Sequence, residues 1–388
     1  MNLAQTTLPP LPFKSSILNE FFHIRKIEIR CIAPITYAQP FYDATMGPFH
    51  SYQTCFVRLT DAEGSIGECE YPSSAVRYLQ DFFAPILLNS TDNYEKIYRR
   101  LFWSIRNEGF RGSAAQALGH LDRVFYDLAA TRKDLPLYQY LGATTNKVKA
   151  YASGGGINIV GTELIDECLS WEAEGYKTIK IKFGGLESSL VDDIQRIQSV
   201  REALQPKTQL AVDANQSLTL LKAKMLVKEL EYLNIAWLEE PVLAASIHEI
   251  SNLCESSKLK IAYGESERSS LVFPTIVQAG VKHLQPIAGH ISSINDWLEI
   301  AQLAQRYNLD FSSGGTSYFN SSFVAIAGKN AKLEFLKPIL EPLSEIFIDK
   351  PKVDRGQFTM VDQPGIGLRV DWERLQKEDR ITGYKVWD

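Results

Sequence analysis

The pattern of hydrophobic and polar positions divides the chain into two regions. Residues 22–34 alternate between apolar and polar side chains, and so do the runs 54–59 and 65–70, which the turn sequence DAEG connects. Alternation with a period of two is typical of strands that bury one face. We therefore expect a three-stranded antiparallel meander in the N-terminal region.

Helical spacing of apolar residues follows the meander over 75–89, 93–106 and 113–133. Apolar residues three and four positions apart form one face of a helix, so we expect three helices that make this an α+β region. His120 and Asp122 lie on the third helix. We expect them to face solvent or to pack, and not to bind a ligand.

A long segment, residues 34–51, separates the first two strands of the meander and is rich in proline, glycine and aromatic residues. A loop of this length inside a compact domain is often functional, for example as a lid over a site. A disordered loop is the alternative. If it is a lid, its aromatic side chains favour a partly apolar substrate: Tyr37, Phe41, Tyr42 and Phe49.

After residue 148, short apolar strands alternate with amphipathic helices such as 187–204 and 217–233. This alternation is typical of βαβ units and a parallel sheet. The strand candidates are 149–153, 178–182, 209–215, 235–240, 260–266, 281–285, 309–313 and 332–336. Eight such units predict an α/β protein with a (β/α)8 barrel, whose chemistry lies at the carboxyl ends of the strands.

Composition and charge exclude several functions. A formal net charge of −5 gives no basic surface for nucleic acid. No apolar run reaches the roughly 18 residues that a membrane span requires. Five cysteines form no CxxC pair and leave one over in any pairing, so we expect reduced thiols and a cytoplasmic protein. The first 22 residues lack the pattern of a signal peptide and are expected to form a flexible arm.

Two lysines end the predicted strand 178–182. Lys180 and Lys182 are two positions apart, so their side chains point to the same side of the strand. Two ammonium groups held close together lower the pKa of at least one of them, which can make a lysine a base near neutral pH. A solvated strand end is the alternative interpretation of this segment.

Three carboxylates fall at the ends of later strands. Asp213, Glu239 and Glu265 follow one another at intervals of 26 residues, about one strand and helix each, which places them at one height on adjacent strands. Three carboxylates in one confined space require a counter-charge, and oxygen ligands alone favour Mg²⁺. Alternatives remain: Glu240 could replace Glu239, and Asp213 could cap the following helix. Asn215 could support the metal or cap that helix.

Together these segments resemble the enolase superfamily, in particular its mandelate racemase and muconate lactonizing enzyme branch. The matching sequences are KIK at 180–182, VDANQS at 212–217, WLEEP at 237–241 and YGES at 263–266, with LPLYQYLG after the helix 113–133 and PGIGLRVD at 364–371. The resemblance covers about residues 23–388 and implies a capping domain, built from both chain ends, over a modified barrel. The implied parts are an arm at 1–22, a capping domain at 23–145 and 337–388, and a barrel at 146–336.

The resemblance also implies the site. Asp213, Glu239 and Glu265 would bind Mg²⁺, Lys182 would be the base, and Lys180 would lower its pKa. Glu334 in the eighth strand matches the family's acidic hydrogen-bond donor to the substrate carboxylate. The implied reaction removes the proton α to a carboxylate through an enediolate, and the implied assembly is a homo-oligomer.

The resemblance fails at the second base. Ile287 and Gly314 stand where the racemase type has an aspartate and a histidine, and His290 stands near the lysine position of the lactonizing type. Dehydration of a hydroxy or sugar acid is therefore favoured, with racemisation or epimerisation, including of amino-acid or dipeptide derivatives, as the alternative. His290 could be a second catalytic group or a loop residue without a role. Two further alternatives are a non-catalytic relative and a nicotinamide reductase that binds phosphate at residues 312–317.

Overall fold

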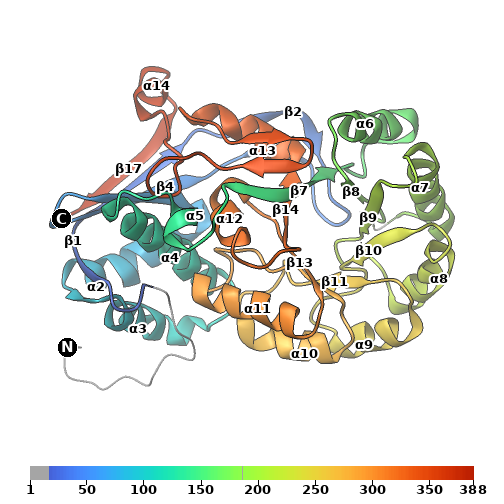
Figure 1. Ribbon diagram of the computed structural model, residues 1–388, viewed down its shortest axis with the longest axis horizontal. Coiled ribbons are helices and arrows are strands. Elements are labelled where there is room, and N and C mark those ends of the chain that lie inside the picture. The colour runs from blue at the N-terminus through green and yellow to red at the C-terminus, as the bar shows by residue number, and fades with distance from the viewer. Residues whose placement is uncertain (1–16, 186) are drawn as a thin grey trace.

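The computed structural model describes residues 17–185 and 187–388 and consists of a mixed α/β cap beside a closed barrel (Figure 1). Most of the predicted N-terminal arm, residues 1–16, lies outside the described residues. No helix in the described part of the chain is long and apolar enough to cross a membrane.

The cap is built on an antiparallel sheet. Its strand order is β17 (Ile381–Trp387), β1 (Phe21–Ile32), β4 (Cys55–Asp61) and β5 (Ile66–Tyr71), while the short β6 (Thr91–Asn93) pairs with the start of β1. The predicted meander is therefore present, and the C-terminal strand completes it. The helices of the cap are α1 (Val76–Tyr78), α2 (Ala84–Leu88), α3 (Tyr94–Ser104), α4 (Ser113–Arg132) and α5 (Leu137–Tyr140).

The long helix α4 packs closely on strand β5. A β-carbon added to Gly67 of β5 would lie 2.5 Å from the carbonyl oxygen of Val124, so only glycine allows this approach. Almost the whole of α4 is buried, including His120 and Asp122. Asp122 accepts hydrogen bonds from the Tyr94 hydroxyl and from the backbone N–H of Ile294, so it packs and does not face solvent.

Cys31 and Cys55 are joined by a disulfide. The expectation of reduced thiols is therefore wrong for this pair, while Cys69, Cys168 and Cys254 are free. The two half-cystines are direct neighbours in the antiparallel register of β1 and β4. Cysteine spacing in the sequence could not reveal this pairing, because it depends on how the two strands align.

The barrel contains all eight predicted strands, in sequence order, and closes where β14 pairs in parallel with β7. This confirms the predicted fold class. The strands are β7 (Lys147–Gly154), β8 (Thr178–Lys182), β9 (Gln209–Asp213), β10 (Ile235–Glu239), β11 (Ile261–Tyr263), β12 (His283–Leu284), β13 (Asp310–Ser313) and β14 (Lys332–Leu336). The helices between them are α6 (Gly161–Ala173), α7 (Leu190–Ala203), α8 (Leu220–Leu230), α9 (Ile247–Ser256), α10 (Phe273–Gln278), α11 (Ile294–Arg306) and α12 (Ser317–Val324).

The C-terminal segment, residues 337–388, contributes first to the barrel and then to the cap. Helix α13 (Lys337–Leu343) follows the last barrel strand, and β16 (Gln357–Thr359) pairs with β7 and with β15 (Lys352–Asp354). After α14 (Trp372–Lys377), β17 returns to the cap. The residue boundaries predicted for the two domains remain predictions.

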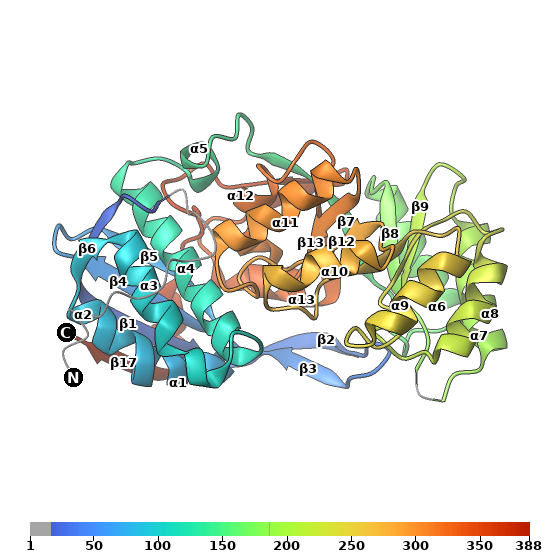
Figure 2. The same cartoon turned by 90° about the horizontal axis from the view of Figure 1, so that it is seen from below.

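The predicted lid is a two-stranded ribbon. Strands β2 (Ile35–Phe41) and β3 (Phe49–Tyr52) pair with each other and extend from the cap toward the barrel (Figure 2). At the tip, the Asp43 carboxylate accepts from the backbone N–H of Thr45 at 2.7 Å. The backbone N–H of Ala44 lies 3.4 Å from Asn215 Oδ1. The segment is therefore ordered and reaches the carboxyl ends of the barrel strands.

Candidate active site

Strand register brings the predicted acids together. Asp213 ends β9 and is the direct neighbour of Glu239, which ends β10, and of Lys182, which ends β8. Glu265 follows β11 by two residues. The equal spacing therefore corresponds to one height for Asp213 and Glu239, whereas Glu265 lies three residues beyond Ala262, the residue of β11 that pairs with Glu239.

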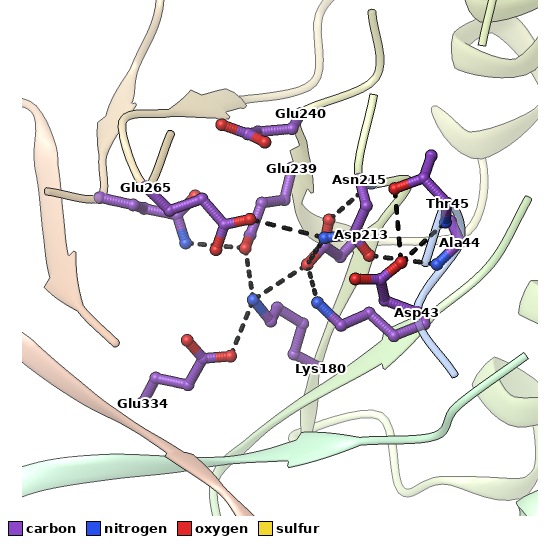
Figure 3. Close-up of polar contacts among 12 residues, drawn as sticks. Asp43, Ala44, Thr45, Lys180, Asp213, Asn215, Glu239, Glu240, Glu265 and Glu334 are labelled. Atoms are coloured by element: carbon purple, nitrogen blue, oxygen red, sulfur yellow. Dashed lines mark hydrogen bonds and ion pairs between the residues drawn. The ribbon is translucent and has the colours of Figure 1, made fainter. Parts of the chain in front are cut away.

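Lys180 lies among these carboxylates (Figure 3), and Lys182 contacts Asp213. The Lys180 Nζ contacts Glu239 Oε1 and lies 3.2 Å from Asp213 Oδ2 and 2.9 Å from Glu334 Oε1. The Lys182 Nζ donates to Asp213 Oδ2. Both lysines are buried, so the alternative of a solvated strand end is wrong.

The two adjacent glutamates point in different directions. Glu239 points into the barrel, where Gln285 donates to its Oε2 at 2.7 Å and the Trp237 indole at 2.9 Å. Glu240 points away and accepts from Gln216 Nε2 at 2.6 Å. The sequence analysis did not include Gln285 and Trp237 among the site residues. Their positions, at or near strand ends and on the inward face of the barrel, could have indicated that they lie in the site.

The helix-capping alternatives for Asp213 and Asn215 are wrong. Helix α8 begins at Leu220, and its cap is Thr219, whose hydroxyl accepts from the backbone N–H of Lys222. Asn215 instead has its amide nitrogen 3.5 Å from both Asp213 Oδ2 and Glu265 Oε1. It therefore links two of the three acids.

The site holds more acidic than basic groups. Burial raises the pKa of Glu239 to about 8, with Asp213 adding to the shift. Burial and Glu240 raise the pKa of Glu265 to about 8. Burial also favours neutral Asp213, but Lys182 and Lys180 outweigh it and hold the pKa of Asp213 below its ordinary value. Two ammonium groups thus do not compensate all the carboxylates.

The excess of carboxylates in the site also raises the pKa values of the two lysines. Burial lowers the pKa of Lys182, and Lys180 contributes in the same direction, as the sequence predicts. Asp213 acts more strongly in the opposite direction, so the pKa of Lys182 is raised overall. Burial likewise lowers the pKa of Lys180, but Glu239, Glu334 and Asp213 raise it well above its ordinary value. Neutral lysine therefore requires another cation near Asp213.

The donor set suits a divalent metal ion by its chemistry. Asp213, Glu239 and Glu265 supply only oxygen atoms, which is the ligand type of Mg²⁺. Within the described ranges, the side chains of histidine, cysteine, aspartate and glutamate form no ready-made cage of three or more ligands, because the lysine amines lie between the acids. Two properties of the site therefore favour Mg²⁺: its ligand atoms are all oxygen, and its carboxylates carry negative charge that the two lysines do not compensate.

Glu334 lies beside Lys180 on the opposite side from Asp213 (Figure 3). Burial raises the pKa of this carboxyl, but Lys180 and Lys182 outweigh that effect and lower it overall. Glu334 also fills the space next to Gly314. A phosphate cradle at residues 312–317 is therefore not supported, since a phosphate there would meet a carboxylate.

His290 lies in the loop after β12, across the barrel from β8. Burial, together with the positive charge of Arg268, lowers the pKa of His290 well below its ordinary value. The ring centroid of His120, on α4 of the cap, lies 6.0 Å away. The structure thus places His290 at the site opposite the lysines, and its catalytic role remains a prediction.

Fold and site together define a barrel enzyme that places amines and acids at the strand ends beneath a cap. A family model described as enolase C-terminal domain-like matches residues 163–374, more than half of the chain. The chain belongs to this family, and the predicted enolase-superfamily assignment is confirmed.

The similar proteins agree with this class. The chain is 28% identical over 299 residues to the L-talarate/galactarate dehydratase of Salmonella typhimurium, covering 76% of this chain and 73% of the relative. It is 25% identical over 346 residues to the 3,6-anhydro-alpha-L-galactonate cycloisomerase of Streptomyces coelicolor, covering 86% and 93%. A crystal structure of a racemase from Streptomyces coelicolor A3(2) with bound magnesium superposes with a TM-score of 0.83 at 23% identity, covering 91% of this chain and 99% of the other.

Proposed function

We propose that this protein is a magnesium-dependent dehydratase of a hydroxy or sugar acid. The observation that carries the proposal is the convergence of Lys182 with Asp213, Glu239 and Glu265 at the ends of adjacent barrel strands. The similarity to a named sugar-acid dehydratase supports the substrate class.

Asp213, Glu239 and Glu265 would hold Mg²⁺, which would supply positive charge beside the carboxylate of a bound substrate and so make the α-proton more acidic. A metal ion at Asp213 also offsets the carboxylate charge that raises the pKa of Lys182. The Lys182 amine then takes the proton from the α-carbon, and the resulting electron pair is delocalised into the carboxylate.

Dehydration follows when the bond between the β-carbon and its hydroxyl oxygen breaks. The hydroxyl leaves as water with a proton from an acid in the site, and the enol product becomes a 2-keto acid. Lys182, once protonated, is the candidate acid, because His290 is neutral near pH 7. This route needs no second base on the strand that carries Gly314. Racemisation or epimerisation remains the second candidate, because His290 faces the lysines across the barrel.

The test is solvent exchange at the α-carbon. The protein is incubated with Mg²⁺ in deuterium oxide with a panel of sugar acids, hydroxy acids and amino-acid derivatives, and deuterium and keto acid are measured by NMR. Keto acid formed with wild type and lost with Lys182→Met supports the proposal. Inverted substrate carrying deuterium identifies an epimerase, and no exchange with any substrate identifies a non-catalytic relative.

A further inference from the structure

An arginine on α7 holds the end of the strand that carries Lys182. The Arg196 guanidinium donates through Nε to the Lys182 carbonyl oxygen at 2.9 Å and through Nη1 to that of Ile159 at 2.6 Å. Its Nη2 donates to the carbonyl oxygens of Gly155 and Gly156, both at 2.9 Å. A guanidinium can only donate and a carbonyl oxygen can only accept, so the direction of all four bonds is fixed.

Arg196 supplies a bond that the barrel sheet does not. The N–H and C=O groups of one strand residue point to the same side of the strand. For Lys182 this is the side of β7, because its N–H donates to the Gly155 carbonyl oxygen at 3.1 Å. Strand β7 ends at Gly154, and Gly155 leaves the sheet with a φ of 56°, which glycine adopts without strain. The strand has therefore ended where the Lys182 carbonyl needs a donor, and Arg196 Nε takes that place.

The other three carbonyl oxygens belong to the loop between β7 and α6, and this loop contacts the β2–β3 ribbon. The backbone N–H of Ile157 donates to the carbonyl oxygen of Tyr42 at 3.2 Å. The side-chain amide of Asn158 donates to the carbonyl oxygen of Pro40 at 3.0 Å. Arg196 therefore joins the end of β8 to a loop that the ribbon itself holds in place.

These bonds matter for the position of the Lys182 amine. A general base must lie within hydrogen-bond reach of the proton that it takes, and the reach of Lys182 begins at its own backbone. We propose that Arg196 is a positioning residue, which fixes the backbone of Lys182 so that the amine points at the α-carbon of a bound acid. The fixing of the backbone does not depend on any reaction, whereas the effect on catalysis rests on the proposed function.

Helix α7 also offers a matched control. Arg201 is buried on the same helix and donates to the carbonyl oxygens of Thr208 at 2.7 Å, Gln205 at 2.7 Å and Leu204 at 3.1 Å. These three residues precede β9, so they lie at the amino ends of the barrel strands, opposite the candidate site. Removing either guanidinium leaves carbonyl oxygens without their donor and should reduce stability. Only the loss of Arg196 affects the strand end that carries the base.

The first test needs neither metal nor substrate. Amide hydrogen exchange, measured by mass spectrometry, should show a loss of protection over residues 178–185 in Arg196→Ala, because the bond from the Lys182 N–H loses its support. Arg201→Ala should retain wild-type protection in this peptide and lose it over residues 204–209. Wild-type protection of residues 178–185 in Arg196→Ala overturns the proposal, and so does an equal loss in both variants.

The second test separates kcat from KM. The reaction is α-proton exchange with Mg²⁺ in deuterium oxide, with the acid of the panel that wild type converts fastest. A displacement of about 1 Å can lower a rate about 100-fold, so Arg196→Ala should lower kcat by about this factor with little change in KM. Arg201→Ala should keep the wild-type kcat.

A conservative variant covers the case in which Arg196→Ala does not fold. Arg196→Lys keeps the positive charge but carries its donors on a single nitrogen, which cannot serve oxygens on both the strand and the loop. We expect it to fold and to lose about tenfold in kcat, the value of one hydrogen bond. A wild-type kcat in Arg196→Lys overturns the proposal.

Failure of this inference can be separated from failure of the proposed function. If no acid in the panel exchanges its α-proton, the dehydratase is wrong, and the amide exchange of residues 178–185 still decides whether Arg196 fixes the strand. If wild type exchanges the α-proton and Arg196→Ala has the same kcat as Arg201→Ala, the positioning role is wrong and the proposed function stands.

Discussion

Glu334 occupies the space that any side chain on Gly314 would need. A β-carbon at residue 314 would lie 2.2 Å from Glu334 Oε2, and Glu334 Oε1 is held 2.9 Å from the ammonium group of Lys180. The strand end that could carry a second base is therefore filled by an acid from the neighbouring strand. A histidine at residue 314, where the racemase type has one, would therefore clash with Glu334 in its present position.

Replacing Gly314 should disturb the site directly. Gly314→Ala forces Glu334 away from Lys180, so we expect a loss of stability of about 1–3 kcal/mol, as for other overpacked positions, and a larger loss of α-proton exchange. Urea unfolding and NMR exchange measure the two effects. Gly383→Ala is the control, because a β-carbon there would make an ordinary contact 3.4 Å from Cys31 Cβ. Wild-type exchange in Gly314→Ala would contradict the assignment of Glu334 to the site.

Magnesium should stabilise the protein through Glu239 and not through Glu240. At 100 times the dissociation constant, a ligand specific to the folded state adds about 2.7 kcal/mol to the free energy of unfolding. We expect Glu239→Gln to lose most of this gain, measured as the magnesium-dependent shift in the unfolding temperature. Glu240→Gln is the matched control, since its side chain is equally buried but points toward Gln216. Equal losses in both variants would refute the ligand assignment.

The two lysines should differ in the metal-free protein. Among the described residues, Lys180 contacts three carboxylates, whereas Lys182 contacts one, that of Asp213. Removing one partner of a buried ion pair costs about 3–5 kcal/mol, so Lys180→Met should destabilise the metal-free protein more than Lys182→Met. Added Mg²⁺ should reduce the difference in stability between the two variants, because the ion supplies the positive charge that the substitution removes. A greater destabilisation by Lys182→Met in chemical unfolding would be inconsistent with this charge distribution.

Asp122 should make stability depend on pH. Burial raises its pKa to about 8 from an ordinary value of 3.8, so the folded protein binds a proton that the unfolded chain releases. This stabilisation is complete below about pH 4 and is lost as pH rises through about 8, by roughly 2–4 kcal/mol between pH 5 and 8. We expect urea unfolding to show that Asp122→Asn has a flatter profile over this range. The exposed Asp166→Asn should retain the wild-type profile, and an unchanged slope in Asp122→Asn would exclude Asp122 as the cause.

Local patterns in the sequence were enough to predict the barrel and the three acids. Each strand is a short apolar run, and parallel strands in consecutive βαβ units place their carboxyl ends at one face. The spacing of Asp213 and Glu239, which are direct neighbours in the register of β9 and β10, therefore carried three-dimensional information. Lys180 and Lys182 followed from the period of two along a strand.

Contacts between distant segments could be decided only by the tertiary structure. The Cys31–Cys55 disulfide depends on the register of β1 against β4, and the inward direction of Glu239 depends on how β10 is seated in the barrel. The pairing of His120 with His290 depends on how closely α4 approaches the barrel at Gly119. The sequence determined which side chains each element presents, because periodicity is local. Packing determined which of them meet, because register and close approach involve residues far apart in the chain.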